Sequence, residues 1–132
     1  MNKLEIFFRY FIEYENYKIV LIGLRNTLVI AICGLLIGIV VGSVVAAFKV
    51  AGTRSRVAKA VSYVGDAYTG IFRGTPIIVQ LIVFHYVILR GSGINPLLEA
   101  VLVFGLNSGA YVAEIMRGGI LSVDVGQLEA GR

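Results

Sequence analysis

The chain has 132 residues, of which 58% are hydrophobic and only 15% are charged, and its mean hydropathy is +0.86. Soluble domains carry about 25% charged residues, so this composition argues against a water-soluble globule, and the apolar content excludes a disordered chain. The net charge of +4 does not indicate nucleic acid as a partner, because the basic residues stand at the ends of apolar runs. A single cysteine excludes an intrachain disulfide, and no metal or cofactor site is expected. The length and composition are those of a one-domain membrane protein.

The N-terminal segment is rich in aromatic side chains. Three of the seven Phe and three of the seven Tyr lie within the first 17 residues. Aromatic rings at this density are typical of the boundary between lipid and water. We therefore expect residues 1–25 to form an interfacial segment and residues 26–132 to form a transmembrane domain.

The first predicted span covers residues 27–48, which carry no charge and are bounded by Arg25 and Lys49. At 1.5 Å per residue this run covers about 30 Å, the thickness of the hydrocarbon core of a bilayer. A small residue recurs at every fourth position, and close backbone contact along such a stripe is how helices associate in lipid. We expect the resulting packing face to consist of Gly34, Gly38, Gly42 and Ala46.

A basic linker follows the first span and contains Lys49, Arg54, Arg56 and Lys59. Apolar residues then recur at helical spacing over residues 57–71, which predicts an amphipathic helix at the cytoplasmic interface. The loop 90–99 has only one basic residue. The positive-inside rule therefore predicts a cytoplasmic linker, an external N-terminus and a cytoplasmic C-terminus.

The second predicted span covers residues 74–89, between Arg73 and Arg90. Its 16 residues reach about 24 Å, and both arginines can extend their charged heads to the interfaces. Thr75 and Pro76 predict the N-cap and the first residue of a helix. A third span over residues 96–116 is weaker, because charged and polar residues interrupt its apolar pattern. The predicted fold is an all-α membrane protein with three spans and an interfacial helix.

The third span has two different faces. Small residues repeat along one side at Gly105, Gly109 and Ala113, and polar residues lie on the opposite side at Asn107, Tyr111 and Glu114. Polar groups are costly in lipid and often mark a transport pathway, so Asn107 and Tyr111 are candidates for one, with packing against another helix as the alternative. Glu114 lies near the predicted cytoplasmic end, where water and Arg117 can satisfy it.

The second span also carries polar groups, Gln80 and His85. We expect both to be hydrogen-bonded structural groups rather than ligands of a bound molecule. No nucleophile–base pair or phosphate-binding loop accompanies them.

Three motifs resemble, in the same order, those of the ABC-type polar amino acid permeases. The first motif consists of Phe72, Arg73, Gly74, Thr75 and Pro76, followed by Gln80. The second motif runs from 110 to 120 and contains Tyr111, Glu114, Arg117, Gly118 and Gly119. The third motif matches the start of the cytoplasmic EAA loop of that family and contains Gly126, Gln127, Glu129 and Ala130.

The resemblance implies a partial ABC importer permease bundle in the bacterial inner membrane. Its partners would be an ABC ATPase, a substrate-binding protein outside the membrane and a second permease subunit. In that family the EAA loop forms a short helix that docks on the ATPase and transmits its closure to the bundle, and Gln127 and Glu129 suit this coupling role by position. ATP hydrolysis would belong to the ATPase, so the chain itself is not expected to be an enzyme.

The last residues depart from the family pattern. Residue 131 is Gly where the family more often has Ala, and the sequence ends at Arg132, inside the motif. We therefore expect an N-terminal part of a permease whose EAA loop begins within residues 117–132. A small membrane scaffold without transport activity is the alternative function, and a small secondary carrier or channel is a third.

Overall fold

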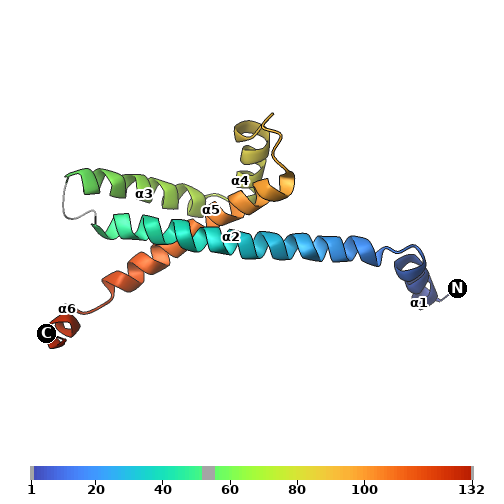
Figure 1. Cartoon of the computed structure of the whole chain (residues 1–132), viewed down its shortest axis with the longest axis horizontal. Helices are drawn as coiled ribbons and strands as arrows, with labels where there is room; N and C mark the ends of the chain where they lie inside the picture. Colours follow the sequence, from blue (N-terminus) through green and yellow to red (C-terminus); the bar gives the residue numbers. More distant parts are fainter. Residues whose placement is uncertain (1, 52–55, 132) are drawn as a thin grey trace.

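The computed structural model describes residues 2–51 and 56–131, and every regular element in this part of the chain is helical, as expected for an all-α protein. Arg54 of the predicted basic linker and Arg132 lie outside the described residues. The elements are α1 (Lys3–Phe8), the π-helical turn η1 (Arg9–Glu13), α2 (Tyr17–Ala51), α3 (Arg56–Gly74), α4 (Ile77–Val83), the π-helical turn η2 (Phe84–Ile88), α5 (Pro96–Leu121) and α6 (Val125–Ala130). Figure 1 shows α2 as the longest element, with α3 beside its second half and α5 crossing it.

The first helix of the bundle, α2, is longer than the span predicted for it. Its 35 residues extend the predicted range 27–48 at both ends, so the boundary predicted after residue 25 falls inside the helix. The helix cannot extend further back, because Glu15 has a φ of 54°, in the left-handed region that interrupts an α-helix. The side-chain amide of Asn16 closes this turn by donating to the carbonyl of Tyr10 at 2.6 Å.

Helices α2 and α5 run in the same direction and touch along their small residues. Gly34 lies against Phe104, Gly38 against Ser108 and Gly42 against Val112, so contacts advance by four residues on each helix together. Figure 1 shows the same direction for both helices, which cross near their middles. The predicted stripe of α2 therefore faces α5, where side chains larger than glycine would hold the two backbones apart.

Helix α3 runs antiparallel to α2, and its small and polar side faces the other helices. Gly65 and Thr69 are buried, whereas Val57, Val64 and Ile71 are exposed. The helix was predicted to lie at the interface on its apolar face. In the structure it lies along α2 instead, with much of the apolar face turned outward. This arrangement suits lipid, which accepts apolar side chains on the outside of a bundle.

The second predicted span, 74–89, is shorter than predicted, and its helix begins at a sharp break after α3. Helix α3 ends at Gly74, and α4 together with η2 covers only residues 77–88, bent by 108° relative to α3. Proline has no backbone N–H and disfavours the helical conformation of the residue before it, which explains the break at Thr75. Thr75 was predicted to be an N-cap. Its hydroxyl instead donates to the carbonyl of Ile71 at 2.8 Å, and Pro76 is the N-cap of α4.

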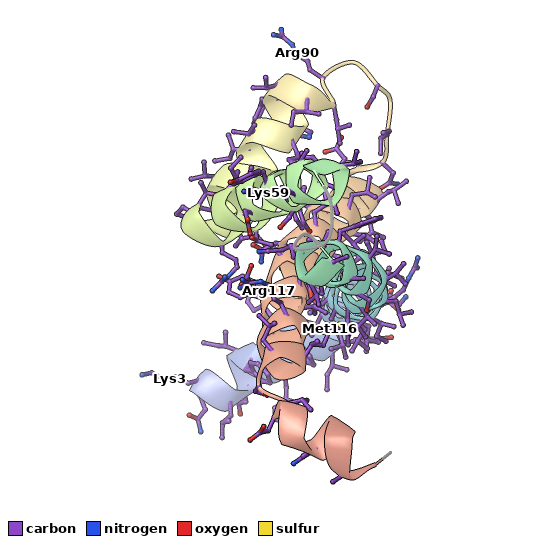
Figure 2. All side chains as sticks on the ribbon, turned by 90° about the vertical axis from the view of Figure 1, so that its left-hand side faces the viewer. Lys3, Lys59, Arg90, Met116 and Arg117 are labelled. Carbon is purple, nitrogen blue, oxygen red and sulfur yellow. The ribbon has the colours of Figure 1, made fainter. Side chains whose placement is uncertain are left out.

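Two of the described helices, α2 and α5, are long and apolar enough to cross a membrane. The bent pair of α3 and α4–η2 satisfies the same test together, as a broken span or a re-entrant segment. Much of α2 has exposed apolar side chains, and Figure 2 shows them as carbon-rich sticks around the end of this helix. Lipid is the environment in which this surface is stable.

The last elements are α5 and α6. Helix α5 begins where predicted, at Pro96, because Asn95 caps it by accepting from the backbone N–H of Leu97 at 2.8 Å. The helix extends to Leu121, beyond the predicted end at residue 116 and into the range 117–132 predicted for the EAA loop. The short helix α6 then lies at the same end of the molecule as the end of α2 and the start of α3 (Figure 1).

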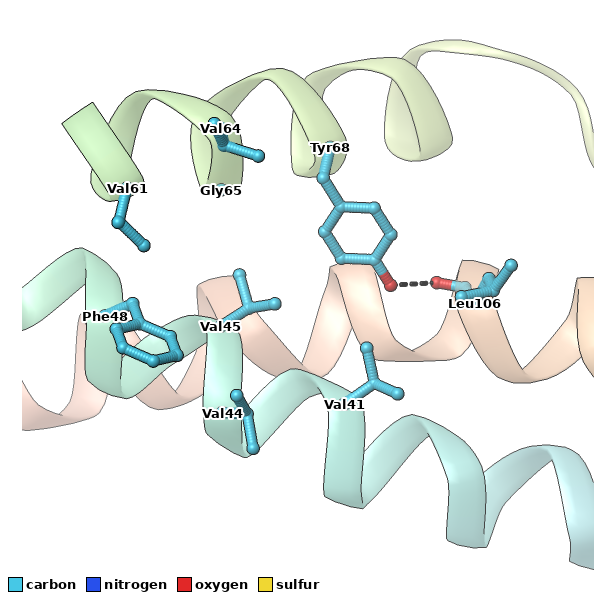
Figure 3. A pocket seen from close by; sticks show the side chains of 9 residues that line it. All are labelled: Val41, Val44, Val45, Phe48, Val61, Val64, Gly65, Tyr68 and Leu106. Carbon is cyan, nitrogen blue, oxygen red and sulfur yellow. Dashed lines mark hydrogen bonds between the residues drawn. The ribbon is translucent and has the colours of Figure 1, made fainter.

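An apolar crevice of about 390 Å³ opens between α2 and α3, with α5 behind it (Figure 3). Valines line most of it, and Tyr68 closes one end, where its hydroxyl donates to the carbonyl of Leu106 at 2.5 Å. This bond ties α3 to α5 beyond the contacts that α3 makes with α2.

Candidate functional site at the junction of α3, α4 and α5

A buried lysine stands at the centre of the polar contacts between helices. The side chain of Lys49, near the end of α2, is only 2% exposed. Its ammonium group pairs with Glu114 of α5, lies 2.8 Å from the carboxylate of Asp66 and donates to the hydroxyl of Thr69 at 3.0 Å. Three acceptors satisfy the three N–H groups of the ammonium, as burial of a charge requires. Lys49 thereby joins α2, α3 and α5.

Glu114 has a different principal partner from the one expected. One carboxylate oxygen pairs with Lys49, whereas the other lies 3.9 Å from Nη1 of Arg73 and 3.9 Å from Nη1 of Arg117. Arg117 was expected to satisfy this carboxylate together with water. It contributes a nearby charge rather than a hydrogen bond, because 3.9 Å exceeds the length of one.

Arg73 brings the first two sequence motifs together. It is the penultimate residue of α3, and its guanidinium lies 5.5 Å from the centre of the ring of Tyr111 on α5. A guanidinium over an aromatic face at this distance is attracted to the ring. Together with Glu114 and Arg117, these residues gather the charged members of both motifs in one place.

The side chain of Gln80 donates hydrogen bonds to backbone carbonyls where α3 ends. Its side-chain N–H groups donate to the carbonyl of Phe72 at 2.8 Å and to the carbonyl of Thr75 at 3.0 Å. These carbonyls lie at the break before Pro76, where the backbone of an uninterrupted helix would supply the donors. Gln80 therefore holds the bend between α3 and α4. Its carbonyl oxygen is buried and has no hydrogen-bond partner in the described part of the chain.

The two candidate pathway residues lie at the edge of this junction. Asn107 accepts a long hydrogen bond of 3.5 Å from Gln80, and Tyr111 is about half-exposed. The side of α5 that carries Tyr111 also exposes Phe104 and Ile115. Within the described residues, α2 contacts this side where Gly34 lies against Phe104, and α3 contacts it where Arg73 lies over Tyr111, yet both aromatic side chains remain partly exposed.

The remaining motif residues lie elsewhere. Gly74 and Pro76 form the break itself, and Gly118 and Gly119 are exposed in the last turns of α5, with no atom close to where a side chain would begin. In α6, Gly126, Gln127 and Ala130 are exposed, and the N–H of Gly126 donates to the side chain of Asp124 at 2.9 Å. The side chain of Glu129 lies outside the described part of the structure. The third motif is thus separate from the junction.

The sequence reasoning missed the role of Lys49 and treated it as part of a basic linker. A signal was present, because Lys49 stands three residues after Ala46 and seven after Gly42, on the same side of the helix as the small-residue stripe. Asp66 and Thr69 were missed as its partners, since contacts between different helices leave no spacing in the sequence.

A second polar contact lies near the start of α5. Nδ1 of His85, on η2, is 2.7 Å from a carboxylate oxygen of Glu99, whose side chain is largely buried. This contact holds η2 against the first turns of α5. Among the described residues, no group of three or more His, Cys, Asp or Glu side chains could hold a metal ion.

Comparison with known proteins identifies the class to which this helical arrangement belongs. No family model matches the chain. It is 38% identical over 113 residues to the arginine transport system permease protein ArtQ of Bacillus subtilis, which covers 84% of this chain and 49% of that protein. It is 34% identical over 129 residues to the nopaline transport system permease protein NocM of Agrobacterium fabrum, covering 89% of this chain and 52% of that protein.

A solved structure of an amino acid ABC transporter with histidines has the same fold. The match has a TM-score of 0.72 and 33% sequence identity, and it covers 92% of this chain and 56% of that one. The fold is therefore that of an ABC transporter permease. The chain is similar in sequence and in fold to amino acid ABC transport permeases, as its three motifs indicated, and it spans about half the length of the relatives it matches. Its apolar helices and these relatives make it a multi-pass protein of the bacterial inner membrane.

Proposed function

We propose that the chain forms part of the membrane-spanning subunit of an ATP-driven importer of amino acids. The observation that carries this proposal is the gathering of Arg73, Tyr111, Glu114 and Arg117 at one junction. Two motifs about 40 residues apart in the sequence meet there, one at the end of α3 and the other on α5, in a chain that is similar to named amino acid permeases. A scaffold without transport activity gives no reason for charged side chains to stay half-exposed where several helices meet.

The side of α5 with Asn107 and Tyr111 would line the pathway. This side leaves Tyr111 about half-exposed, and it carries polar groups between apolar residues. A second permease subunit, or further helices of the complete bundle, would close it from the opposite side. The glycine faces of α2 and α5 would then hold the bundle together rather than conduct the substrate.

The partners would be an ABC ATPase on the cytoplasmic side and a substrate-binding protein on the outside. Helix α6 would dock on the ATPase through Gly126, Gln127, Glu129 and Ala130. The position of α6 supports this docking, because the helix projects from the end of α5 and its described side chains are exposed. Docking would couple ATP-driven closure to alternating access of the bundle.

The orientation would place the N-terminus outside and the C-terminus in the cytoplasm. Since α2 and α5 run in the same direction, the end of α2, the start of α3 and helix α6 share one side, and the basic residues of the sequence support a cytoplasmic location for it. Cysteines replacing Ala51 and Ser92, in a Cys33→Ala background, should be labelled by an impermeant reagent from opposite sides of intact cells and inverted vesicles. Labelling of both from one side would contradict this orientation.

Co-purification tests the central proposal. The chain extended by the second half of a homologous permease should retain an ATPase in mild detergent and should support amino acid uptake with a matching binding protein. Glu129→Lys in this protein should reduce both, because it reverses a charge in the docking helix, whereas Lys59→Glu on the exposed side of α3 should change neither. Uptake without ATP, or no association with any ATPase, would contradict the proposal.

A further inference from the structure

We propose that Arg73 and Arg117 form a binding site for the carboxylate of the transported amino acid. The inference rests on the proposed function and assigns a substrate group to particular side chains. Both guanidiniums are about two-fifths exposed, at 43% and 42%, and both point toward the same oxygen of Glu114. They come from different helices and from different motifs.

The two guanidiniums have unused hydrogen-bonding capacity. Each carries five N–H donors in a fixed planar arrangement. Within the described part of the chain neither group donates a hydrogen bond, since their contacts with Glu114 are 3.9 Å long. Glu114 does not neutralise them fully either, because its other oxygen pairs with the buried Lys49.

The charges around the site leave an excess of positive charge. Lys49, Arg73 and Arg117 contribute three positive charges, whereas Asp66 and Glu114 contribute two negative charges. One additional anion would balance the cluster. A carboxylate is the matching anion, because its two oxygens accept hydrogen bonds from guanidinium groups in a planar geometry.

The spacing also fits a carboxylate. Both Nη1 atoms lie 3.9 Å from one oxygen, so they are no further apart than twice that distance. A carboxylate that accepts a charge-assisted hydrogen bond of about 2.8 Å at each oxygen can bridge such a gap. The ring of Tyr111 under Arg73 holds one side of the site in place.

The location suits a transported substrate rather than a structural ion. The guanidinium of Arg73 lies over Tyr111, and Asn107 stands one turn earlier on α5, so the site adjoins both residues proposed to line the pathway. Every amino acid carries a carboxylate, so this site would recognise the feature that different substrates share. Discrimination among side chains would then be made elsewhere.

Nuclear magnetic resonance of the arginine Nε–H groups tests the site in the purified 132-residue chain, labelled with 15N-arginine in lipid nanodiscs. The probes are L-arginine and L-glutamine, each compared with its carboxamide, which lacks the carboxylate. We expect the acids to shift the signals of Arg73 and Arg117 saturably, with an affinity about tenfold or more above that of the amides, as loss of a hydrogen bond to a charged group predicts. The matched control is Arg90, which lies at the far tip of the molecule from Arg117 (Figure 2).

Variants separate binding from folding. Arg73→Lys and Arg117→Lys keep the charge but remove the planar pair of donors, so each should abolish most of the preference for acid over amide, whereas Arg90→Lys should retain it.

Three results with the unsubstituted chain would overturn the inference: equal responses to acids and amides, equal shifts at Arg90, or no response to either acid. None of these results depends on whether a variant folds. If the signals of Arg73 and Arg117 shift only when the protein concentration changes, the two guanidiniums bind an acidic group of a second copy of the chain. This result would also overturn the inference. Because this test needs neither ATPase nor uptake, its failure would leave the proposed transport function standing.

Discussion

The contact between α2 and α5 and the junction of α3, α4 and α5 hold the same bundle together by opposite means. Along the first, Gly34, Gly38 and Gly42 let two backbones approach closely, with no charged side chain at these three positions. At the second, a buried lysine, a carboxylate and a glutamine amide bridge helices whose backbones are interrupted or inclined. The first contact depends on shape and tolerates no added atoms. The second depends on the pairing of charges and tolerates no missing partner.

Removing one partner of the buried charge cluster should cause the largest loss of stability. Lys49→Ala leaves the carboxylate of Glu114 without its main partner, so we expect a loss of about 3–5 kcal/mol. Unfolding by sodium dodecyl sulfate in mixed micelles, followed by circular dichroism, measures it. The double variant with Met at positions 49 and 114 should recover most of the loss, and Lys59→Ala, at an exposed position, should cost little.

Filling the glycine contact should have the next largest effect. A Cβ atom on Gly42 would lie 2.6 Å from Cβ of Val112 and 2.8 Å from the backbone oxygen of Gly109. Gly42→Leu should therefore separate the helices and cost about 1–3 kcal/mol in the same assay. Gly23→Leu is the control, because no atom lies within 4 Å of where its Cβ would be. Equal effects of the two substitutions would show that the glycine stripe does not hold α2 on α5.

A single hydroxyl distinguishes the two kinds of contact on α3. Tyr68→Phe keeps the ring that lines the apolar crevice and removes only the bond to the carbonyl of Leu106 (Figure 3). The expected loss is about 1 kcal/mol, the usual contribution of one hydrogen bond. Tyr63→Phe, on the exposed side of α3, should leave the unfolding midpoint unchanged. A larger loss at position 63 than at 68 would contradict this assignment.

The smallest effect is expected where Arg73 lies over Tyr111. Both side chains are about half-exposed, so the attraction between cation and ring should contribute about 0.5–1 kcal/mol. Tyr111→Leu should lose this amount, and Tyr111→Phe should retain it, because the ring remains. The difference between these two variants, measured in the same micelles, isolates the ring. If Phe and Leu behave alike, the ring does not position Arg73.

The sequence by itself was enough to establish the class of fold and the family. Long uncharged runs predict spanning helices, because the bilayer sets their length. The small-residue stripes followed from spacing alone, since positions four apart share one side of a helix. The predicted start of α5 at Pro96 was also right, because proline at the first position and the cap from Asn95 act locally and need no distant partner.

Only the tertiary structure decided which side of α3 faces the bundle and what satisfies Glu114. Lys49 and Glu114 are 65 residues apart, and no local pattern links a residue near the end of α2 to a residue in the second half of α5. The apolar side of α3 predicted an interfacial helix, but in lipid an apolar side can equally face outward, so periodicity alone could not choose between the two. The break at Thr75 was decided partly by the sequence and partly by the tertiary structure. Pro76 predicts a break locally, whereas the bend of 108° depends on Gln80, whose side chain donates to the backbone carbonyls left without partners there.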